Sequence, residues 1–120
     1  MAAKDELGRA GEQHAARYLE DRGYEILARN WRCSQGEIDI VAVARGWLCV
    51  VEVKTRSSAA FGHPLDAIDS RKLGRLWQLA YAWVAAHPER ARGLALRVEA
   101  VSIIGADPAA GEIEHLVDIS

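Results

Sequence analysis

The chain has 120 residues, half of them hydrophobic and 27% charged, with a formal net charge of −2. This balance predicts one globular domain over residues 1–120, and it excludes a disordered chain and a dedicated, strongly basic nucleic-acid binder. No apolar run approaches the roughly 20 residues that cross a membrane, and the amino terminus lacks the apolar core of a secretory signal. The two cysteines show no zinc or redox spacing, so we expect a cytoplasmic protein that does not engage a membrane.

Hydrophobic periodicity and turn signals divide the chain into two helices and five strands. The first helix is expected over residues 5–22, and the second covers residues 69–87 with Asp69 or Ser70 as its N-cap. The expected strands cover residues 24–30, 39–44, 47–55, 94–104 and 113–119. The order α-β-β-β-α-β-β predicts an α/β fold in which both helices pack on a mixed sheet and a parallel crossover follows the hairpin.

Charged residues lie inside the apolar hairpin of the second and third strands. If Arg45-Gly46 forms a two-residue turn, the pairing register places Asp39 directly opposite Glu52. The same register places Glu37 opposite Lys54. Because side chains alternate along a strand, these four residues are expected on one face near the open end of the hairpin. The other face then carries the apolar side chains Ile38, Ile40, Val51 and Val53.

Two opposed carboxylates, Asp39 and Glu52, favour a divalent metal site. Carboxylates about 5 Å apart repel each other by about 3 kcal/mol at an effective dielectric constant near 20, and a cation such as Mg²⁺ turns that repulsion into attraction. The alternative is a cross-strand pair of Glu37 with Lys54, in which the other two acids point to solvent or adopt another register.

Glu12 is a further candidate because it follows the small and apolar stripe of the first helix. If that stripe faces the sheet, the Glu12 carboxylate reaches the hairpin acids and joins the metal shell. The alternative is a partly exposed helical glutamate beside Arg9 or His14.

Five motifs carry a family resemblance. Glu12, Glu37-Ile38-Asp39 and Glu52-Val53-Lys54 resemble the PD-(D/E)XK nuclease signature, although Ile38 replaces the proline that often precedes the metal-binding aspartate. More closely, the chain is identified as a member of the YraN-like family, which is similar to archaeal Holliday-junction resolvases and restriction-endonuclease-like folds. The motifs are Gly8-Arg9-x-Gly11-Glu12, Ala28-Arg29-Asn30-Trp31-Arg32, Gly36-Glu37-Ile38-Asp39, Val51-Glu52-Val53-Lys54-Thr55-Arg56, and Phe61-Gly62-x-Pro64 followed by Lys72 in a helix.

The resemblance implies a restriction-endonuclease-like core and a role for each acid. Asp39 and Glu52 would be the principal ligands of Mg²⁺ or Mn²⁺, and Glu12 would complete or bridge the shell through water. Lys54 would lie beside the attacking water or the scissile phosphate, either as a base or as a stabiliser of negative charge. Glu37 is interpreted as the partner that orients Lys54 or an arginine, with a third metal-binding acid as the alternative.

The candidates for holding flanking phosphates are Arg32, Arg56 and Lys72, each with a structural or solvated charge as the alternative. The expected function is a Mg²⁺-dependent endonuclease that hydrolyses DNA, with branched structures among its substrates. If junctions are the substrate, the resemblance to resolvases implies a homodimer. The alternative is a nucleic-acid-binding or partner-docking module that retains the fold with little or no catalysis.

Overall fold

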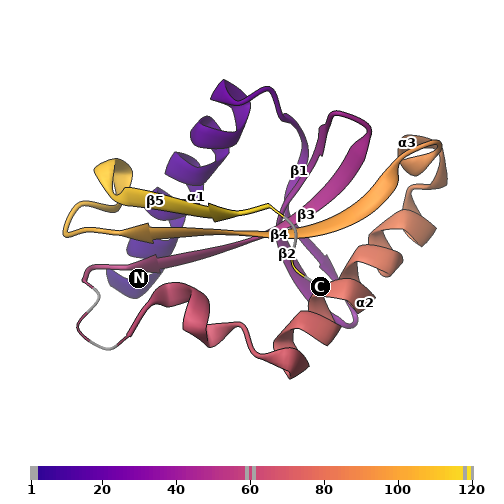
Figure 1. Ribbon diagram of the computed structural model, residues 1–120. Helices are drawn as coiled ribbons and strands as arrows, with labels where there is room; N and C mark the ends of the chain where they lie inside the picture. The colour runs from indigo at the N-terminus through magenta and orange to yellow at the C-terminus, as the bar shows by residue number, and fades with distance from the viewer. Residues whose placement is uncertain (1–2, 59, 61, 118, 120) are drawn as a thin grey trace.

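The computed structural model of the chain describes residues 3–58, 60, 62–117 and 119. Within this part the elements follow the predicted order, with one additional short helix (Figure 1). The helices are α1 (Ala3–Asp21), α2 (Ser70–Ala86) and α3 (Pro88–Ala91). The strands are β1 (Glu25–Cys33), β2 (Gly36–Ala44), β3 (Trp47–Arg56), β4 (Ala95–Ile104) and β5 (Glu112–Leu116).

The five strands form one sheet in chain order, β1-β2-β3-β4-β5. Strands β3 and β4 are parallel, whereas the other three neighbouring pairs are antiparallel. A parallel pair needs a crossover connection, and α2 lies within it. The α/β fold with a mixed sheet is therefore confirmed, and it is consistent with a restriction-endonuclease-like core.

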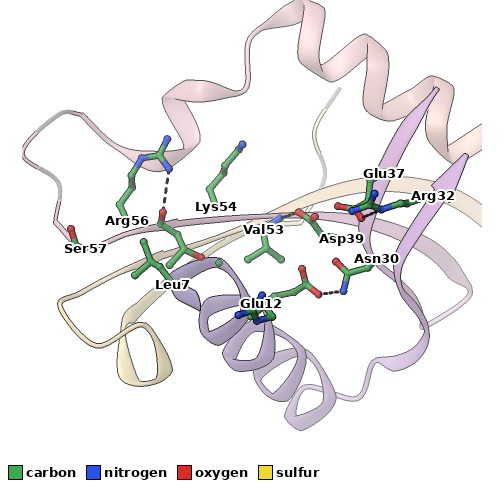
Figure 2. A pocket seen from close by; sticks show the side chains of 13 residues that line it. Leu7, Glu12, Asn30, Arg32, Glu37, Asp39, Val53, Lys54, Arg56 and Ser57 are labelled. Atoms are coloured by element: carbon green, nitrogen blue, oxygen red, sulfur yellow. Dashed lines mark hydrogen bonds and ion pairs between the residues drawn. The ribbon is translucent and has the colours of Figure 1, made fainter. Parts of the chain in front are cut away.

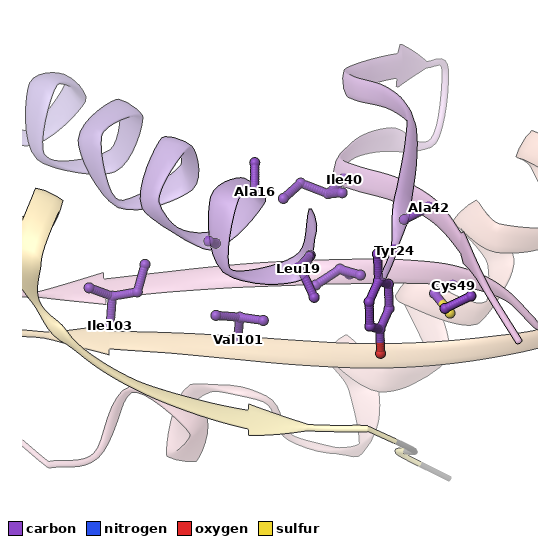
Figure 3. Packing of buried hydrophobic residues seen from close by; sticks show 11 residues of the cluster. Ala16, Leu19, Tyr24, Ile40, Ala42, Cys49, Val101 and Ile103 are labelled. Carbon is purple, nitrogen blue, oxygen red and sulfur yellow. The ribbon is translucent and has the colours of Figure 1, made fainter. Parts of the chain in front are cut away.

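The two long helices cover opposite faces of the sheet. Leu19 of α1 packs with Val51 of β3, whereas Trp83 of α2 packs with the neighbouring Val50. Because successive residues of a strand point to opposite faces, these two clusters form separate cores. Figure 3 labels residues of the α1-side core, which are Ala16 and Leu19 of α1 together with Tyr24, Ile40, Ala42, Cys49, Val101 and Ile103.

The predicted hairpin register is confirmed from the turn to the pair Ile40 and Val51. Arg45 and Gly46 both have positive φ angles, as a two-residue turn between twisted strands requires. The ladder then runs regularly from the turn as far as Ile40 opposite Val51.

Beyond Ile40 the sheet forks, and the prediction that Ile38 and Ile40 share a face is wrong. Strand β2 stays paired with β1, while β3 stays paired with β4 as far as Arg56. Ile38 packs in the cluster beneath α2, whereas Ile40 packs in the cluster beneath α1. The regular alternation of side chains is therefore broken at Asp39, where β2 leaves β3.

Several local features differ from the sequence prediction. The loop after β3 contains a 3₁₀ turn at Pro64–Ala67, and a second turn at Pro108–Ala110 precedes β5. The predicted N-cap of α2 is confirmed at Asp69, whose side chain accepts the Lys72 N–H at 2.9 Å. Strand β5 ends at Leu116 rather than at residue 119. Phe61, which belongs to one of the family motifs, lies outside the described residues.

No helix in the described part of the chain has both the length and the apolar character needed to cross a membrane.

Candidate functional site

An open cleft of about 780 Å³ lies at the fork of the sheet, between α1 and the ends of β1, β2 and β3 (Figure 2). It contains most of the residues that the sequence singled out. The charged residues that line it are Arg9, Glu12, Arg32, Glu37, Asp39, Lys54 and Arg56.

Asp39 lies at the branch point and is held by the backbone of β3. Its Oδ2 accepts the N–H of Val53 at 2.8 Å. Because the ladder between β2 and β3 ends at the preceding pair, the Asp39 carboxylate supplies the acceptor that the β2 backbone no longer provides. The fork thus brings a carboxyl group between two strands that are separating.

Glu52 is the second acid, and only 7% of its surface is exposed. Its Oε2 lies 2.8 Å from Lys72 Nζ and 3.5 Å from Lys54 Nζ. A buried carboxylate needs such partners because water no longer solvates it. Lys54 comes from the same strand and Lys72 from the first turn of α2, so the helix delivers a lysine that the hairpin alone does not contain.

Asp39 and Glu52 are close enough to share a hydrogen bond between their carboxyl groups. Burial, followed by the charge of Glu52, raises the pKa of Asp39 well above its ordinary value. Burial also acts to raise the pKa of Glu52, but the bond from Asp39 and the two lysines outweigh it and lower that pKa. Without a cation, the pair therefore retains one shared proton to a higher pH than an isolated carboxyl group does.

Glu12 reaches the cleft because α1 lies very close to β3. A Cβ atom on Gly11 would collide with the side chain of Thr55, so glycine permits this approach. The next residue, Glu12, then points toward the cleft, and its charge contributes to the raised pKa of Asp39.

The partners of Glu12 on β1 were not predicted from the sequence. Its Oε1 accepts Nδ2 of Asn30 at 2.8 Å and lies 3.3 Å from Nη2 of Arg29. Asn30 has a positive φ, a conformation that asparagine tolerates better than most residues do. His14, suggested as a neighbour by helical spacing, instead has its Nε2 at 3.0 Å from the carbonyl oxygen of Gly111.

The remaining predicted residues line the cleft or its edge. Glu37 accepts Nε of Arg32 at 2.8 Å, so it orients an arginine rather than Lys54. Arg56 is exposed at the end of β3, where its Nη1 donates to the carbonyl of Thr55 at 3.1 Å. Lys54 and Arg56 point to the side of β3 away from α1 (Figure 2).

The acidic side chains at the cleft match the ligands of a hard cation such as Mg²⁺ only in part. Among the described residues, no group of three or more His, Cys, Asp or Glu side chains is arranged to hold a metal. Asp39 lines the open cleft, and its neighbour Glu52 lines a smaller cavity of about 150 Å³ next to α2. One or two carboxylates with water and phosphate oxygens are the ligands that Mg²⁺ ordinarily uses. The carboxyl groups of Asp39 and Glu52 are therefore the ones that would hold Mg²⁺ or Mn²⁺.

A second buried acid, Glu99 of β4, was not singled out from the sequence. It is fully buried and is surrounded by donors. Tyr24 donates to its Oε1 at 2.8 Å, His115 Nε2 lies 2.7 Å from the same atom, and Arg97 Nε donates to its Oε2 at 2.8 Å. Burial acts to raise the pKa of Glu99, but these bonds outweigh it and lower that pKa.

Comparison with known proteins places these features in a family context. Residues 11–103 match the uncharacterised protein family UPF0102. A UPF0102 protein of Arthrobacter sp. is 51% identical to this chain, with 97% of each chain covered. UPF0102 proteins of Beutenbergia cavernae and Leifsonia xyli are 47% and 46% identical, covering 97% and 99% of each chain respectively.

Proposed function

The chain belongs to the uncharacterised protein family UPF0102, the same family as the YraN-like proteins, and from this premise we propose that it is a Mg²⁺- or Mn²⁺-dependent endonuclease acting on DNA. The observation that supports the proposal best is the pairing of Asp39, which lines an open, arginine-lined cleft, with the buried Glu52, which Lys54 contacts. Structural ion pairs ordinarily join opposite charges, whereas this pair places two acids together at a concave surface.

Each residue of the cleft has a role in the proposed reaction. Asp39 and Glu52 would bind the cation, which lowers the pKa of bound water and polarises a phosphoryl oxygen. Lys54 would lie beside the reacting phosphate, where its ammonium group offsets developing negative charge. Burial and then the neighbouring Lys72 lower the pKa of Lys54, which also brings it closer to a form that accepts a proton from water.

The arginines would position the DNA on either side of this centre. Arg32 lies at one edge of the cleft, where Glu37 holds its guanidinium group, and Arg56 lies at the end of β3. Contacts of this kind hold the phosphate backbone without reading its sequence. Glu12, held by Asn30, would contact the cation through water.

A second candidate function is a nucleic-acid-binding or partner-docking module without efficient chemistry. The observation that favours it is the engagement of Glu52 by Lys72 at 2.8 Å, because a lysine in contact with the acid competes with a cation for it. This function predicts saturable DNA binding that weakens steeply with salt and gives no cleaved product.

The setting of the proposed activity is the cytoplasm, in keeping with two free cysteines, Cys33 and Cys49. If four-way junctions are the substrate, a homodimer would present two cleavage centres to two symmetric strands. Sedimentation of the protein with and without junction DNA tests this assembly.

The proposal is tested by incubating the protein with single-stranded, duplex, flapped and four-way DNA in Mg²⁺, Mn²⁺ or EDTA. We expect cleavage of at least one substrate that requires the cation. Asp39→Asn and Glu52→Gln should each lower the rate by at least about 100-fold, because the stabilisation supplied by the cation amounts to several kcal/mol.

The control variant is Glu89→Gln, which removes an exposed acid from α3 and should cut like the wild type. Absence of product from every substrate, or equal cleavage by Asp39→Asn, would overturn the proposed nuclease. Binding without cleavage would favour the second candidate.

A further inference from the structure

The side chains of β3 that take part in the proposed reaction project on the α2 side of the sheet. Val50 packs beneath α2, and the ladder between β3 and β4 continues regularly to the end of β3. Because side chains alternate along a strand, Glu52 and Lys54 lie on the same face as Val50. Thr55, on the opposite face, lies against Gly11 of α1. A substrate that reaches Lys54 therefore passes along the α2 side of the fork.

The smaller cavity next to α2 lies on this side of the sheet. Glu52 lines it together with Lys72 and Arg75, which are three residues apart and therefore neighbours on the surface of the helix. Glu37 lines both this cavity and the main cleft, so the two spaces adjoin. The cavity volume of about 150 Å³ is roughly that of five water molecules, which is room enough for one phosphate group.

The two acids that line the smaller cavity are already engaged by basic groups. Glu37 accepts Nε of Arg32 at 2.8 Å, and Oε2 of Glu52 lies 2.8 Å from Nζ of Lys72. Within the described part of the chain, no hydrogen bond or ion pair holds the guanidinium group of Arg75. An ammonium group has three donors, so Lys72 can donate into the cavity while it contacts Glu52. Donors of both kinds are therefore available to an anion there.

The smaller cavity and the main cleft meet at the paired acids. Asp39 lines the cleft, and Glu52 lines the cavity. Arg56 lines the cleft at the end of β3, four residues beyond Glu52, which is roughly 13 Å along a strand. Arg75 lines the cavity beside α2. A DNA backbone that contacts both arginines therefore passes over the paired acids.

We propose that the smaller cavity is a phosphate-binding site, in which Arg75 and Lys72 hold a phosphate of the DNA backbone close to the one that is cut. This inference rests on the proposed function of the cleft, and it adds a contact on the α2 side of the paired acids. A guanidinium group donates two parallel N–H bonds to a phosphate, which fixes the geometry of the contact as well as balancing charge. Arg75 is therefore a positioning residue that presents the reacting phosphate to Asp39 and Glu52.

The first test measures binding of a labelled, flapped DNA duplex by fluorescence anisotropy, with Ca²⁺ replacing Mg²⁺ to slow cleavage. Arg75→Gln should weaken binding and reduce its salt dependence by about one phosphate contact. The affinity lost between about 50 and 200 mM salt should then be about threefold smaller than for the wild type. Arg75→Lys should retain most of the salt dependence, because it keeps the positive charge.

The control variant for this test is Arg90→Gln, which removes an exposed arginine from α3. The strand that follows α3 begins beside Trp47, at the end of β3 opposite to Arg56. Arg90→Gln should therefore bind the flapped duplex with the affinity and the salt dependence of the wild type.

The second test identifies the phosphate that the cavity holds. Uncharged methylphosphonate linkages replace one phosphate at a time on either side of the bond that is cut. One of these linkages should raise KM for the wild type and leave kcat nearly unchanged. In Arg75→Gln that linkage should have little further effect, because two changes that remove the same contact are not additive. A merely structural role of Arg75 would leave every linkage with its wild-type effect.

The outcomes separate the phosphate site from the proposed chemistry. If Arg75→Gln and Arg90→Gln bind alike, or if every linkage acts on Arg75→Gln as on the wild type, the phosphate site is wrong and the proposed nuclease is unaffected. If Arg75→Gln weakens binding but the wild type cuts no substrate, the phosphate site stands and the proposed nuclease fails. If the wild type binds no DNA, both fail.

Discussion

Two acids on the same sheet, Glu99 and Asp39, have opposite surroundings. Glu99 is fully buried, and hydrogen-bond donors from Tyr24, Arg97 and His115 satisfy both of its oxygens. Asp39 has one backbone donor and a second acid, Glu52, as its neighbour, and it faces an open cleft. Their pKa values shift in opposite directions, downward for Glu99 and upward for Asp39.

This difference distinguishes Glu99, whose partners all come from the fold, from Asp39, which remains accessible to a ligand. Glu99 has as many partners as a buried carboxylate needs, so no further cation is required there. Asp39 and Glu52 instead place two carboxyl groups next to each other, and Asp39 faces the open cleft. Burial of an acid is therefore a weak indicator of function until its partners are counted.

The largest expected effect is on stability, and it concerns Glu99. Glu99→Gln should lower the free energy of unfolding by about 3–5 kcal/mol, because Arg97 loses its buried partner. Asp39→Asn should cause no such loss, since an amide oxygen still accepts the Val53 N–H and the amide N–H can donate to Glu52 as the protonated carboxyl group does. Urea denaturation at neutral pH in EDTA measures both. Similar losses for the two variants would contradict the distinction between the clusters.

The second expected effect is on how the stability of the wild type and of Asp39→Asn depends on pH. The pKa of Asp39 is higher in the folded state than in the unfolded state, so the wild type loses stability as the pH rises through that raised pKa. In EDTA, Asp39→Asn should match the wild type near about pH 4 and exceed it by about 1–3 kcal/mol near about pH 9.

The contribution of Glu99 to stability depends on pH in the opposite direction. Its pKa is lowered by folding, so its contribution is present at neutral pH and is lost as the pH falls through the folded pKa. Thermal denaturation between about pH 4 and pH 9 measures the pH dependence expected for Asp39 and for Glu99. An advantage of Asp39→Asn that does not change with pH would show that folding does not raise the pKa of Asp39.

The smallest effect concerns Lys72, which the sequence placed among the phosphate contacts and the structure places on Glu52. If its ammonium group competes with a divalent cation, Lys72→Met should bind Mn²⁺ about threefold to tenfold more tightly, since the pair is partly exposed and its interaction is modest. Isothermal titration calorimetry measures the affinity, with Arg71→Met as the control on the same helix. Weaker binding by Lys72→Met would mean that Lys72 supports the site instead.

The sequence predicted the hairpin correctly where local rules apply. The Arg45-Gly46 turn and the alternation of residues determine the register from the turn to Ile40 and Val51. The prediction fails beyond that pair because alternation presupposes a continuous ladder. The Asp39 side chain replaces a backbone acceptor there, and nothing in a pattern of apolar residues indicates where two strands separate.

Contacts between distant segments account for the other differences. Helical spacing suggested partners for Glu12 within its own helix, but Arg29 and Asn30 come from β1. Asn30 belonged to a recognised motif, and its tolerance of positive φ was a signal that it occupies a special position. Glu99 also carried a signal, as an acid within an apolar strand, but its partners Tyr24 and His115 lie far away in the sequence.

The central claim, that Asp39 and Glu52 form a divalent cation site, is tested most directly by titrating Mn²⁺ and following free ion by electron paramagnetic resonance. The account predicts saturable binding of about one ion per chain, or two where substrate phosphates contribute ligands. It also predicts that binding is lost in Asp39→Asn and retained in Glu89→Gln. Equal binding by the wild type and Asp39→Asn, or no binding by either, would contradict it.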